Sequence, residues 1–279
     1  FFFKQKTAYE IYQCDWSSDV CSSDLTIVDA RVFRRDVLRS CTPASLRAAT
    51  AGARIERAWR RAKHVVLDLS NGHRITVSPR FTGALLLEPG DWDKGRGDYT
   101  VLVFPLGDGR TLRYRDVRRL GTVTLHDATA FTAWEAALGP EPLESAFTAA
   151  AFRAAIAGTR RAIKTVLMDQ RRIAGIGNIY ANEALWRARI RPHRAASSLT
   201  MAEARALHRE SVRVLELAVA QRGTSFRDYQ DPYGGRGGFL GLAKVYAREG
   251  EPCVRCKTTL RHTHALENRI TVWCPRCQR

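Results

Sequence analysis

The sequence predicts an α+β multidomain protein in which a β-sandwich or barrel is followed by a helical domain and then by a small ribbon with four cysteines. Short apolar segments separated by turn residues run from residue 26 to about residue 124, which is typical of strands. Apolar residues at helical spacing then continue to residue 222. The four cysteines form two close pairs near the end of the chain. We therefore expect domains at residues 26–126, 127–238 and 239–279.

The first domain is predicted to contain short strands and one helix. Thr42 and Pro43 predict the start of a helix over residues 44–51, with the threonine as N-cap and the proline at the first helical position. Gly107-Asp-Gly109 predicts a hairpin turn between the last two strands. The strands are expected at residues 26–33, 65–69, 75–77, 84–87, 99–104 and 111–114.

The second domain is predicted to be helical. Its last helix opens with Thr200-Met-Ala-Glu203, which has the form of a capping box. A glycine-rich stretch at residues 231–238 predicts a loop or linker before the ribbon, whose strands are expected at 258–260 and 270–273. The helices are expected at residues 128–138, 148–157, 159–169, 178–188 and 200–222.

The chain is strongly basic, with a formal net charge of +17 and a pI of about 10.2. These charges are spread through apolar-rich segments rather than gathered in a tail, which favours a folded protein that binds nucleic acid. No apolar run reaches the roughly 18 residues that a membrane span needs. We therefore expect a soluble protein without a membrane partner.

Cys253, Cys256, Cys274 and Cys277 follow the pattern C-x2-C, seventeen residues, C-x2-C. Two thiolate pairs with this spacing can converge tetrahedrally on one Zn²⁺, whereas a disulfide framework does not require the repeat. The sequence thus predicts one structural zinc ion. Cys41 is most simply a small buried apolar residue.

Residues 1–25 differ in composition from the rest of the chain and show neither a helical nor a strand period. They hold two lysines against four acidic residues, and they lack the basic and apolar regions of a signal peptide. The segment resembles translated sequencing-adapter DNA, so we expect it to be non-native and outside the fold. The alternative is a natural but disordered extension, which leads to the same structural expectation.

The stretch from Ile173 to Glu183 places Gly175, Gly177 and Asn178 in a tight turn just before a helical run. Backbone N–H groups at such a turn form a site for an anion, and a nucleic-acid phosphate is the anion that a basic chain would meet. The alternative is an ordinary turn between two helices.

Other candidate residues are weaker when taken singly. Lys63 precedes a buried strand and could reach a phosphate, although a solvated lysine is as good an interpretation. Arg118 and Arg119 lie in a predicted loop, where surface charge is common. Phe81 lies in a predicted turn and could wedge into a base stack, although a buried phenylalanine is commoner. Arg269 lies on the ribbon, where a hairpin could direct it into a groove.

Four segments together indicate a family. They are Arg61-Ala-Lys63, Asp116-Val-Arg-Arg-Leu-Gly121, the run from Ile163 through Glu183, and the segment from Gly250 through Cys277. From residue 26 to residue 279 the sequence resembles the formamidopyrimidine-DNA glycosylase and endonuclease VIII family of base-excision DNA repair enzymes. The resemblance implies a β-sandwich, a helix-two-turn-helix domain and a zinc ribbon. It also implies a bacterial cytoplasmic, nucleoid-associated monomer that acts on damaged double-stranded DNA.

The resemblance also implies roles for individual residues. Lys164 and Asn178 would bind phosphates beside the lesion, with N–H donors from the turn at Gly175 and Gly177. Lys63 would contact phosphate and assist the first elimination step, and Arg269 would assist the second. Phe81, Arg118 and Leu120 would fill the gap that a flipped nucleotide leaves in the duplex. Arg119 would be a further DNA contact.

The family attacks the sugar with the amine of an N-terminal proline and uses a neighbouring glutamate as the acid. An α-amino group has a pKa near 8, so a useful fraction is neutral and nucleophilic. The family's Met-Pro-Glu start falls where residues 1–25 stand, and an in-chain proline nitrogen is an amide that cannot replace it. We therefore expect the native gene product to be a glycosylase and lyase, and the polypeptide as written to bind DNA without cleaving it.

Some residues depart from the family pattern. Phe81 stands where methionine is usual, Leu120 where phenylalanine is usual, and residues 97–99 where histidines are common. The glycine-rich region at 224–239 corresponds to a loop over an oxidised purine, which favours 8-oxoguanine and formamidopyrimidines as substrates. The alternatives are an endonuclease VIII-like preference for oxidised pyrimidines and a non-catalytic DNA-binding zinc protein.

Overall fold

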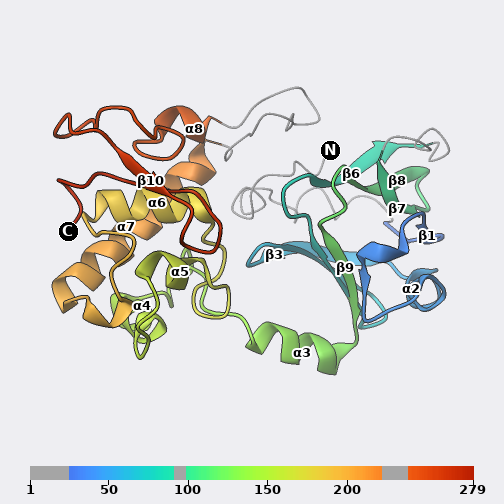
Figure 1. The fold of residues 1–279 in the computed structure, drawn as a ribbon. Coiled ribbons are helices and arrows are strands. Elements are labelled where there is room, and N and C mark those ends of the chain that lie inside the picture. The colour runs from blue at the N-terminus through green and yellow to red at the C-terminus, as the bar shows by residue number, and fades with distance from the viewer. Residues whose placement is uncertain (1–24, 91–98, 222–237) are drawn as a thin grey trace. The chain divides into compact units, whose positions relative to one another are not determined.

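The computed structural model describes residues 25–90, 99–221 and 238–279, which form two compact units. The first unit contains the described residues up to Glu135, and the second contains those from Ala136 onward (Figure 1). The helical part and the ribbon therefore share one compact unit. The glycine-rich stretch at 231–238 lies almost entirely outside the described residues.

The first unit is a β-sandwich, as predicted. Its five-stranded sheet has the order β2-β9-β5-β4-β3, and its four-stranded sheet has the order β1-β7-β8-β6. Apolar side chains of both sheets, among them Leu67, Ile75 and Leu102, form one buried core. The strands are β1 Arg31–Val32, β2 Leu38–Arg39, β3 Ile55–Arg61, β4 His64–Leu69, β5 Arg74–Ser78, β6 Gly83–Pro89, β7 Thr100–Pro105, β8 Arg110–Asp116 and β9 Thr122–His126.

The helix and the hairpin turn that strong local sequence signals predicted are both present in this unit. Helix α2, Pro43–Thr50, begins with Thr42 as N-cap, whose side chain accepts a hydrogen bond from the Ser45 N–H. The turn at Gly107–Gly109 joins β7 to β8, which pair in antiparallel fashion. Cys41 is partly buried against the core rather than fully buried.

Several features of this unit differ from the predictions, which also placed no strand at β2 or β9. Residues 26–33 form only the short strand β1 and two isolated bridges at Thr26 and Ile27. Strand β3 was missed because it is an edge strand whose arginines hide the strand period. Leu25, placed outside the fold by the sequence prediction, is buried in the core because its apolar side chain lies beside the first residues of the sandwich.

Helices form most of the second unit. A short 3-10 helix, η4, Ala196–Ser198, lies in the connection before the last long helix. Helix α3 lies in the first unit except for its last residue, and its Phe131 and Trp134 pack on His126 of the sandwich. The helices are α3 Ala128–Ala136, α4 Ala149–Ile156, α5 Ile163–Met168, α6 Asn178–Arg187, α7 Met201–Ala220 and α8 Phe239–Leu242.

Helix α5 is shorter than the predicted helix over 159–169. Ala162 forms a bridge with Ala195 instead, and the Ile163 N–H donates to the Arg194 carbonyl at 2.7 Å. These long-range backbone bonds take the place of the first helical turn.

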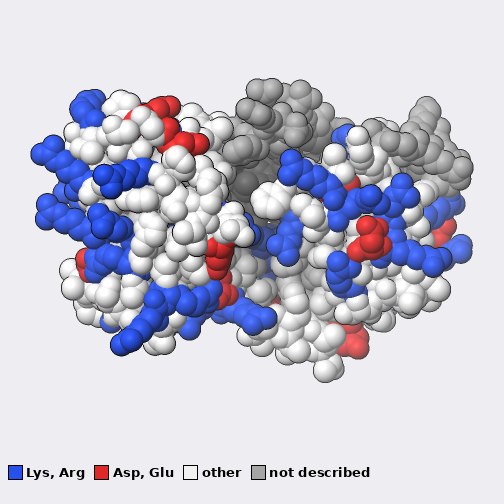
Figure 2. Space-filling model, in the orientation of Figure 1, with Lys and Arg blue, Asp and Glu red and all other residues white. Residues whose placement is uncertain are grey.

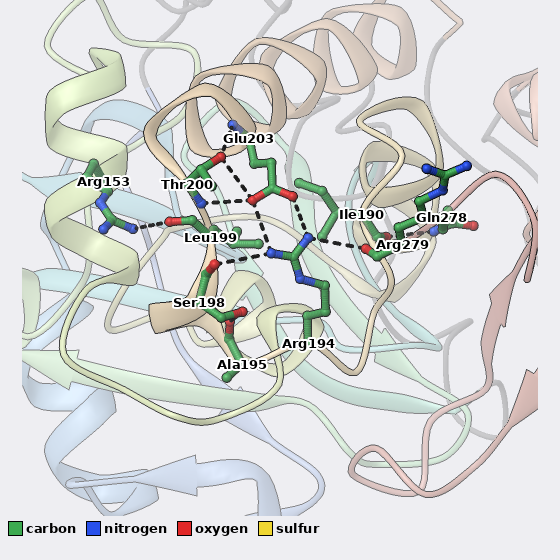
Figure 3. Close-up of polar contacts among 10 residues, drawn as sticks. All are labelled: Arg153, Ile190, Arg194, Ala195, Ser198, Leu199, Thr200, Glu203, Gln278 and Arg279. Atoms are coloured by element: carbon green, nitrogen blue, oxygen red, sulfur yellow. Dashed lines mark hydrogen bonds and ion pairs between the residues drawn. The ribbon is translucent and has the colours of Figure 1, made fainter.

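The predicted capping box at α7 is present and is tied to the end of the chain. Thr200 accepts from the Glu203 N–H, and Glu203 accepts from the Thr200 N–H. Figure 3 shows that Arg194 pairs with Glu203 and also donates to the carbonyl of Arg279. The buried Gln278 donates to the Ile190 carbonyl at 2.9 Å. These contacts join the last residues of the ribbon to the helical part.

The ribbon contains the antiparallel pair β10 Arg261–Thr263 and β11 Thr271–Trp273. The strand predicted at 258–260 was placed three residues too early. Its backbone pairs elsewhere, because the Leu260 N–H donates to the Glu251 carbonyl and the Thr258 carbonyl accepts from Cys253.

Candidate nucleic-acid interface and metal centre

Lys63 lies in the turn between β3 and β4, which pair up to Arg61 and His64. The turn is tight, and Ala62 has a positive φ of 52°. His64 packs edge-on against Trp134 of α3, with ring centroids 5.2 Å apart. Burial, together with the positive charge of Arg80, lowers the pKa of His64 to about 4. The imidazole beside Lys63 is therefore neutral at physiological pH.

Two loops of the sandwich present large apolar side chains to solvent. Phe81, between β5 and β6, is 69% exposed, and Leu120, between β8 and β9, is 51% exposed. The interpretation of Phe81 as a buried turn residue is therefore wrong. Arg118 and Arg119 are exposed on the second loop. Arg119 has a carboxylate 4.0 Å away, that of Asp36, at a distance where an exposed ion pair contributes little.

The glycine turn of the second unit has the predicted position at the start of α6. Gly175 has a φ of 78°, and Gly177 is the N-cap of α6 without a side-chain cap. The Gly175 N–H donates to Gln170 Oε1 at 2.7 Å, so it does not face outward as predicted. The long side chain of Gln170 folds back to satisfy it. Within the described part of the chain, no hydrogen bond is seen for the Gly177 N–H.

Asn178, the first residue of α6, has its side chain held in place. Asn182 Nδ2 donates to Asn178 Oδ1 at 3.3 Å, and the Tyr246 hydroxyl is hydrogen-bonded to the Asn178 side chain. Burial raises the pKa of Tyr246, so the phenol stays protonated at neutral pH.

Glu183 is a buried residue of this region that sequence reasoning did not single out. Its carboxylate accepts backbone N–H bonds from Lys244, Val245 and Tyr246 at 2.9 to 3.0 Å. A buried charge needs such partners. Its position among the apolar residues of α6 could have predicted this role, because an acidic residue in such a place is expected to be buried and hydrogen-bonded.

Lys164 differs most from its predicted setting, because its exposed fraction is 0%. Its Nζ donates to the Ile270 carbonyl at 2.8 Å and to Thr271 Oγ1 at 2.7 Å. Burial, together with the positive charge of Arg269, lowers the pKa of Lys164 to about 7. In this structure Lys164 faces the ribbon hairpin, not solvent, because its two acceptors lie at the start of β11.

Arg269 is exposed in the loop between β10 and β11. Glu267 and Asn268 have φ values of 55° and 52°, which turn the chain sharply just before it. The Arg269 carbonyl accepts from Thr271 Oγ1 at 3.1 Å, the same hydroxyl that Lys164 contacts. The loop that presents Arg269 is thus anchored at its base.

The four predicted cysteines converge. Their Sγ atoms all lie within 4.8 Å of one another, with Cys256 and Cys274 3.5 Å apart and Cys253 and Cys277 4.0 Å apart. Tetrahedral zinc with Zn–S bonds of about 2.3 Å places its sulfurs about 3.8 Å apart. The donor set therefore fits one tetrahedral metal ion.

Basic side chains dominate the surface in view. Figure 2 shows Lys and Arg spread over both units, with Asp and Glu in smaller groups between them. No helix among the described residues is long and apolar enough to cross a membrane.

The β-sandwich, the helical part with its glycine turn and the four-cysteine ribbon are the parts found in one class of DNA repair glycosylases. The family model for the formamidopyrimidine-DNA glycosylase N-terminal domain matches residues 18–123, and that for the H2TH domain of the same enzymes matches residues 138–230. The chain belongs to the formamidopyrimidine-DNA glycosylase family.

Individual relatives agree with this assignment. The formamidopyrimidine-DNA glycosylase of Roseiflexus sp. is 40% identical over 264 residues, covering 92% of this chain and 96% of that protein. That of Chloroflexus aggregans is 42% identical over 237 residues, covering 85% of each.

Two solved structures also match. One is Lactococcus lactis Fpg with DNA that contains an abasic site, with a TM-score of 0.85 and 25% identity over 99% of this chain and 100% of that chain. The other is the MutM (Fpg) protein of Thermus thermophilus, with a TM-score of 0.82 and 32% identity over 98% of each chain.

Proposed function

We propose that the native form of this protein is a monomeric base-excision repair glycosylase and lyase that removes oxidised purines from duplex DNA. The observation that carries the proposal is the pair of exposed apolar side chains, Phe81 and Leu120, on loops that also hold Arg118 and Arg119. Apolar side chains among arginines suit a gap in a base stack, because the stack is apolar and the flanking phosphates are anionic. An enzyme that flips a nucleotide out of the duplex must fill that gap.

The second unit supplies phosphate contacts in this proposal. The Gly177 N–H and the Asn178 side chain lie at the start of α6, where a helix favours an anion. Arg269 reaches the groove from the ribbon. Lys164 supports that reach, because its two hydrogen bonds hold the base of the Arg269 loop. Lys63 assists the first elimination step and Arg269 the second.

Zinc is the metal that we propose for the four cysteines. Cys253, Cys256, Cys274 and Cys277 would hold it with no open position for substrate, so its role is structural. The bound ion would fix the two knuckles, which are the turns at residues 253–256 and 274–277. The β10–β11 hairpin extends from these knuckles.

The N-terminal segment decides whether this polypeptide is active. We propose that the chain with residues 1–25 as written binds damaged DNA without cleaving it, because the family's nucleophile is the amine of a proline in a Met-Pro-Glu start. Of these residues, 1–24 lie outside the part that the structure describes.

Binding to a stable abasic analogue tests the DNA-binding part of the proposal. We expect the 279-residue chain to prefer a duplex with a tetrahydrofuran site over the same duplex undamaged, and we expect Phe81→Ala to reduce that preference. Arg213→Ala, at an exposed arginine of α7, is the matched control. Equal binding to both duplexes by the parent chain would contradict the proposal.

The lesion preference separates the two enzyme classes. The purine preference rests on residues 224–239, which fall almost wholly outside the described residues. A chain with a restored Met-Pro-Glu start should excise 8-oxoguanine faster than dihydrouracil from matched duplexes. The reverse order would assign an endonuclease VIII-like specificity instead.

A further inference from the structure

Asp116 lies at the end of β8 with an exposed fraction of 0%, and donors from three separate segments meet its carboxylate. The Thr82 hydroxyl donates to Oδ1 at 2.6 Å. The Gly121 N–H donates to Oδ2 at 2.8 Å, and the Tyr114 hydroxyl donates to the same oxygen at 3.3 Å. A buried carboxylate is stable only with such partners. Burial raises the pKa of Tyr114, and the adjacent carboxylate raises it further, so the phenol remains a donor.

The partners of Asp116 stand beside the two exposed apolar side chains. Thr82 follows Phe81 in the chain, and Gly121 follows Leu120. The two loops are also joined directly, because the Arg118 N–H donates to Thr82 Oγ1 at 3.0 Å. One carboxylate therefore holds both loops at their bases.

Two glycines make this arrangement possible. A Cβ built on Gly121 would lie 1.8 Å from the Tyr114 hydroxyl, and one built on Gly83 would lie 2.7 Å from it and 2.5 Å from the Pro79 carbonyl. A Cβ atom does not approach an oxygen atom of another residue this closely. A side chain at either position would therefore collide with the Tyr114 hydroxyl that donates to Asp116.

We propose that Asp116 is a positioning residue that joins the Phe81 loop and the Leu120 loop into one rigid wedge and so sets how the wedge enters DNA at a lesion. The inference rests on the proposed function for what the wedge does. Its structural part, the joining of the loops, is independent of DNA.

Hydrogen exchange in the free protein tests the joining of the loops. Asp116→Ala should speed exchange of the Gly121 and Arg118 amides at least about tenfold. Gly121 loses its acceptor, and Thr82 Oγ1, the acceptor of Arg118, loses the hydrogen bond that holds it in place. Thr82→Val keeps the buried carboxylate and the side-chain shape, and should speed exchange of Arg118 while sparing Gly121. Asp108→Ala, at the opposite end of the same strand pair, is the control. If Asp116→Ala fails to fold, Thr82→Val carries the test, and unchanged Arg118 protection would overturn the inference.

A double-mutant cycle on DNA tests positioning against general destabilisation. Thr82→Val should reduce the preference for the tetrahydrofuran duplex several-fold, and it should have no further effect when Phe81 is already alanine. Equal effects in both backgrounds would overturn the positioning role. A parent chain without any preference would overturn the proposed function, whereas the exchange result would still report on the joining of the loops.

Discussion

Lys164 shows how burial changes the chemistry of a single residue. Its ammonium group is enclosed between α5 and the ribbon, and its pKa is lowered to about 7 from an ordinary value of 10.5. The folded protein therefore releases this proton near neutral pH, whereas the unfolded chain keeps it up to about pH 10. Between these values the unfolded state binds more protons, so the free energy of unfolding should rise with pH.

The expected rise of the free energy of unfolding with pH leads to a direct prediction. As the pH rises from about 7 to about 10, the parent chain should gain stability relative to Lys164→Met, because the methionine cannot lose a proton. Urea unfolding midpoints at several pH values measure the difference. Lys244→Met, at a half-buried lysine of the same unit, is the control. A constant difference between parent and Lys164→Met would contradict the prediction.

Arg269 contacts the same Thr271 hydroxyl as Lys164 through its carbonyl, but its side chain is exposed. If its guanidinium neutralises one phosphate, Arg269→Ala should make the log–log salt dependence of duplex binding shallower by about 0.9. Fluorescence anisotropy over a range of salt concentrations measures the slope, with Arg213→Ala as the control. A slope equal to that of the parent would remove Arg269 from the phosphate contacts.

Among the elements of the second unit, the ribbon is tied to α6 by residues that lie close to its cysteines in the chain. The Arg255 guanidinium lies 3.8 Å from the centroid of the Trp186 ring and donates to the Trp186 carbonyl. Asn182 Oδ1 accepts from the Val272 N–H at 2.8 Å. Because α6 also begins with Asn178, we expect loosening of the ribbon to affect the helix that carries the proposed phosphate-binding turn.

Metal loss tests this coupling. Cys277→Ser should lower the metal content and shift tryptophan emission, since Trp186 loses Arg255 when the knuckles open. Duplex affinity should fall with it. Cys41→Ser removes a thiol outside the metal set and should change none of the three readings. A Cys277→Ser protein with full metal content and parental emission would contradict the coupling.

Features with short-range causes were predictable from the sequence. The caps at Thr42 and Thr200 depend on residues three positions away, and the metal set depends on cysteine spacing. The burial of Lys164 was not predictable, because its acceptor Ile270 is 106 residues away in the chain. The same holds for Asp116, whose partner Thr82 lies 34 residues earlier. Contacts between residues so far apart in the chain leave no periodic pattern in the sequence from which they could be predicted.

The chain as a whole belongs to the formamidopyrimidine-DNA glycosylase family. In our proposal, the reactive amine comes from the N-terminal segment. The family model reaches back to residue 18, within the segment that the sequence prediction set aside. Our proposal therefore separates binding from chemistry in this chain: the described residues would hold the binding parts, and the first residues would determine cleavage.

The most direct test compares the 279-residue polypeptide with a chimera in which the Met-Pro-Glu start and following residues of the Roseiflexus relative precede Thr26. Both are assayed on an 8-oxoguanine duplex, with borohydride added to trap the Schiff base. The chimera should excise the base, cut the strand and form the trapped complex, and a chimera with its proline changed to glycine should not. The parent polypeptide should bind the duplex and leave it intact. Strand cleavage by the parent at the rate of the chimera would contradict the account.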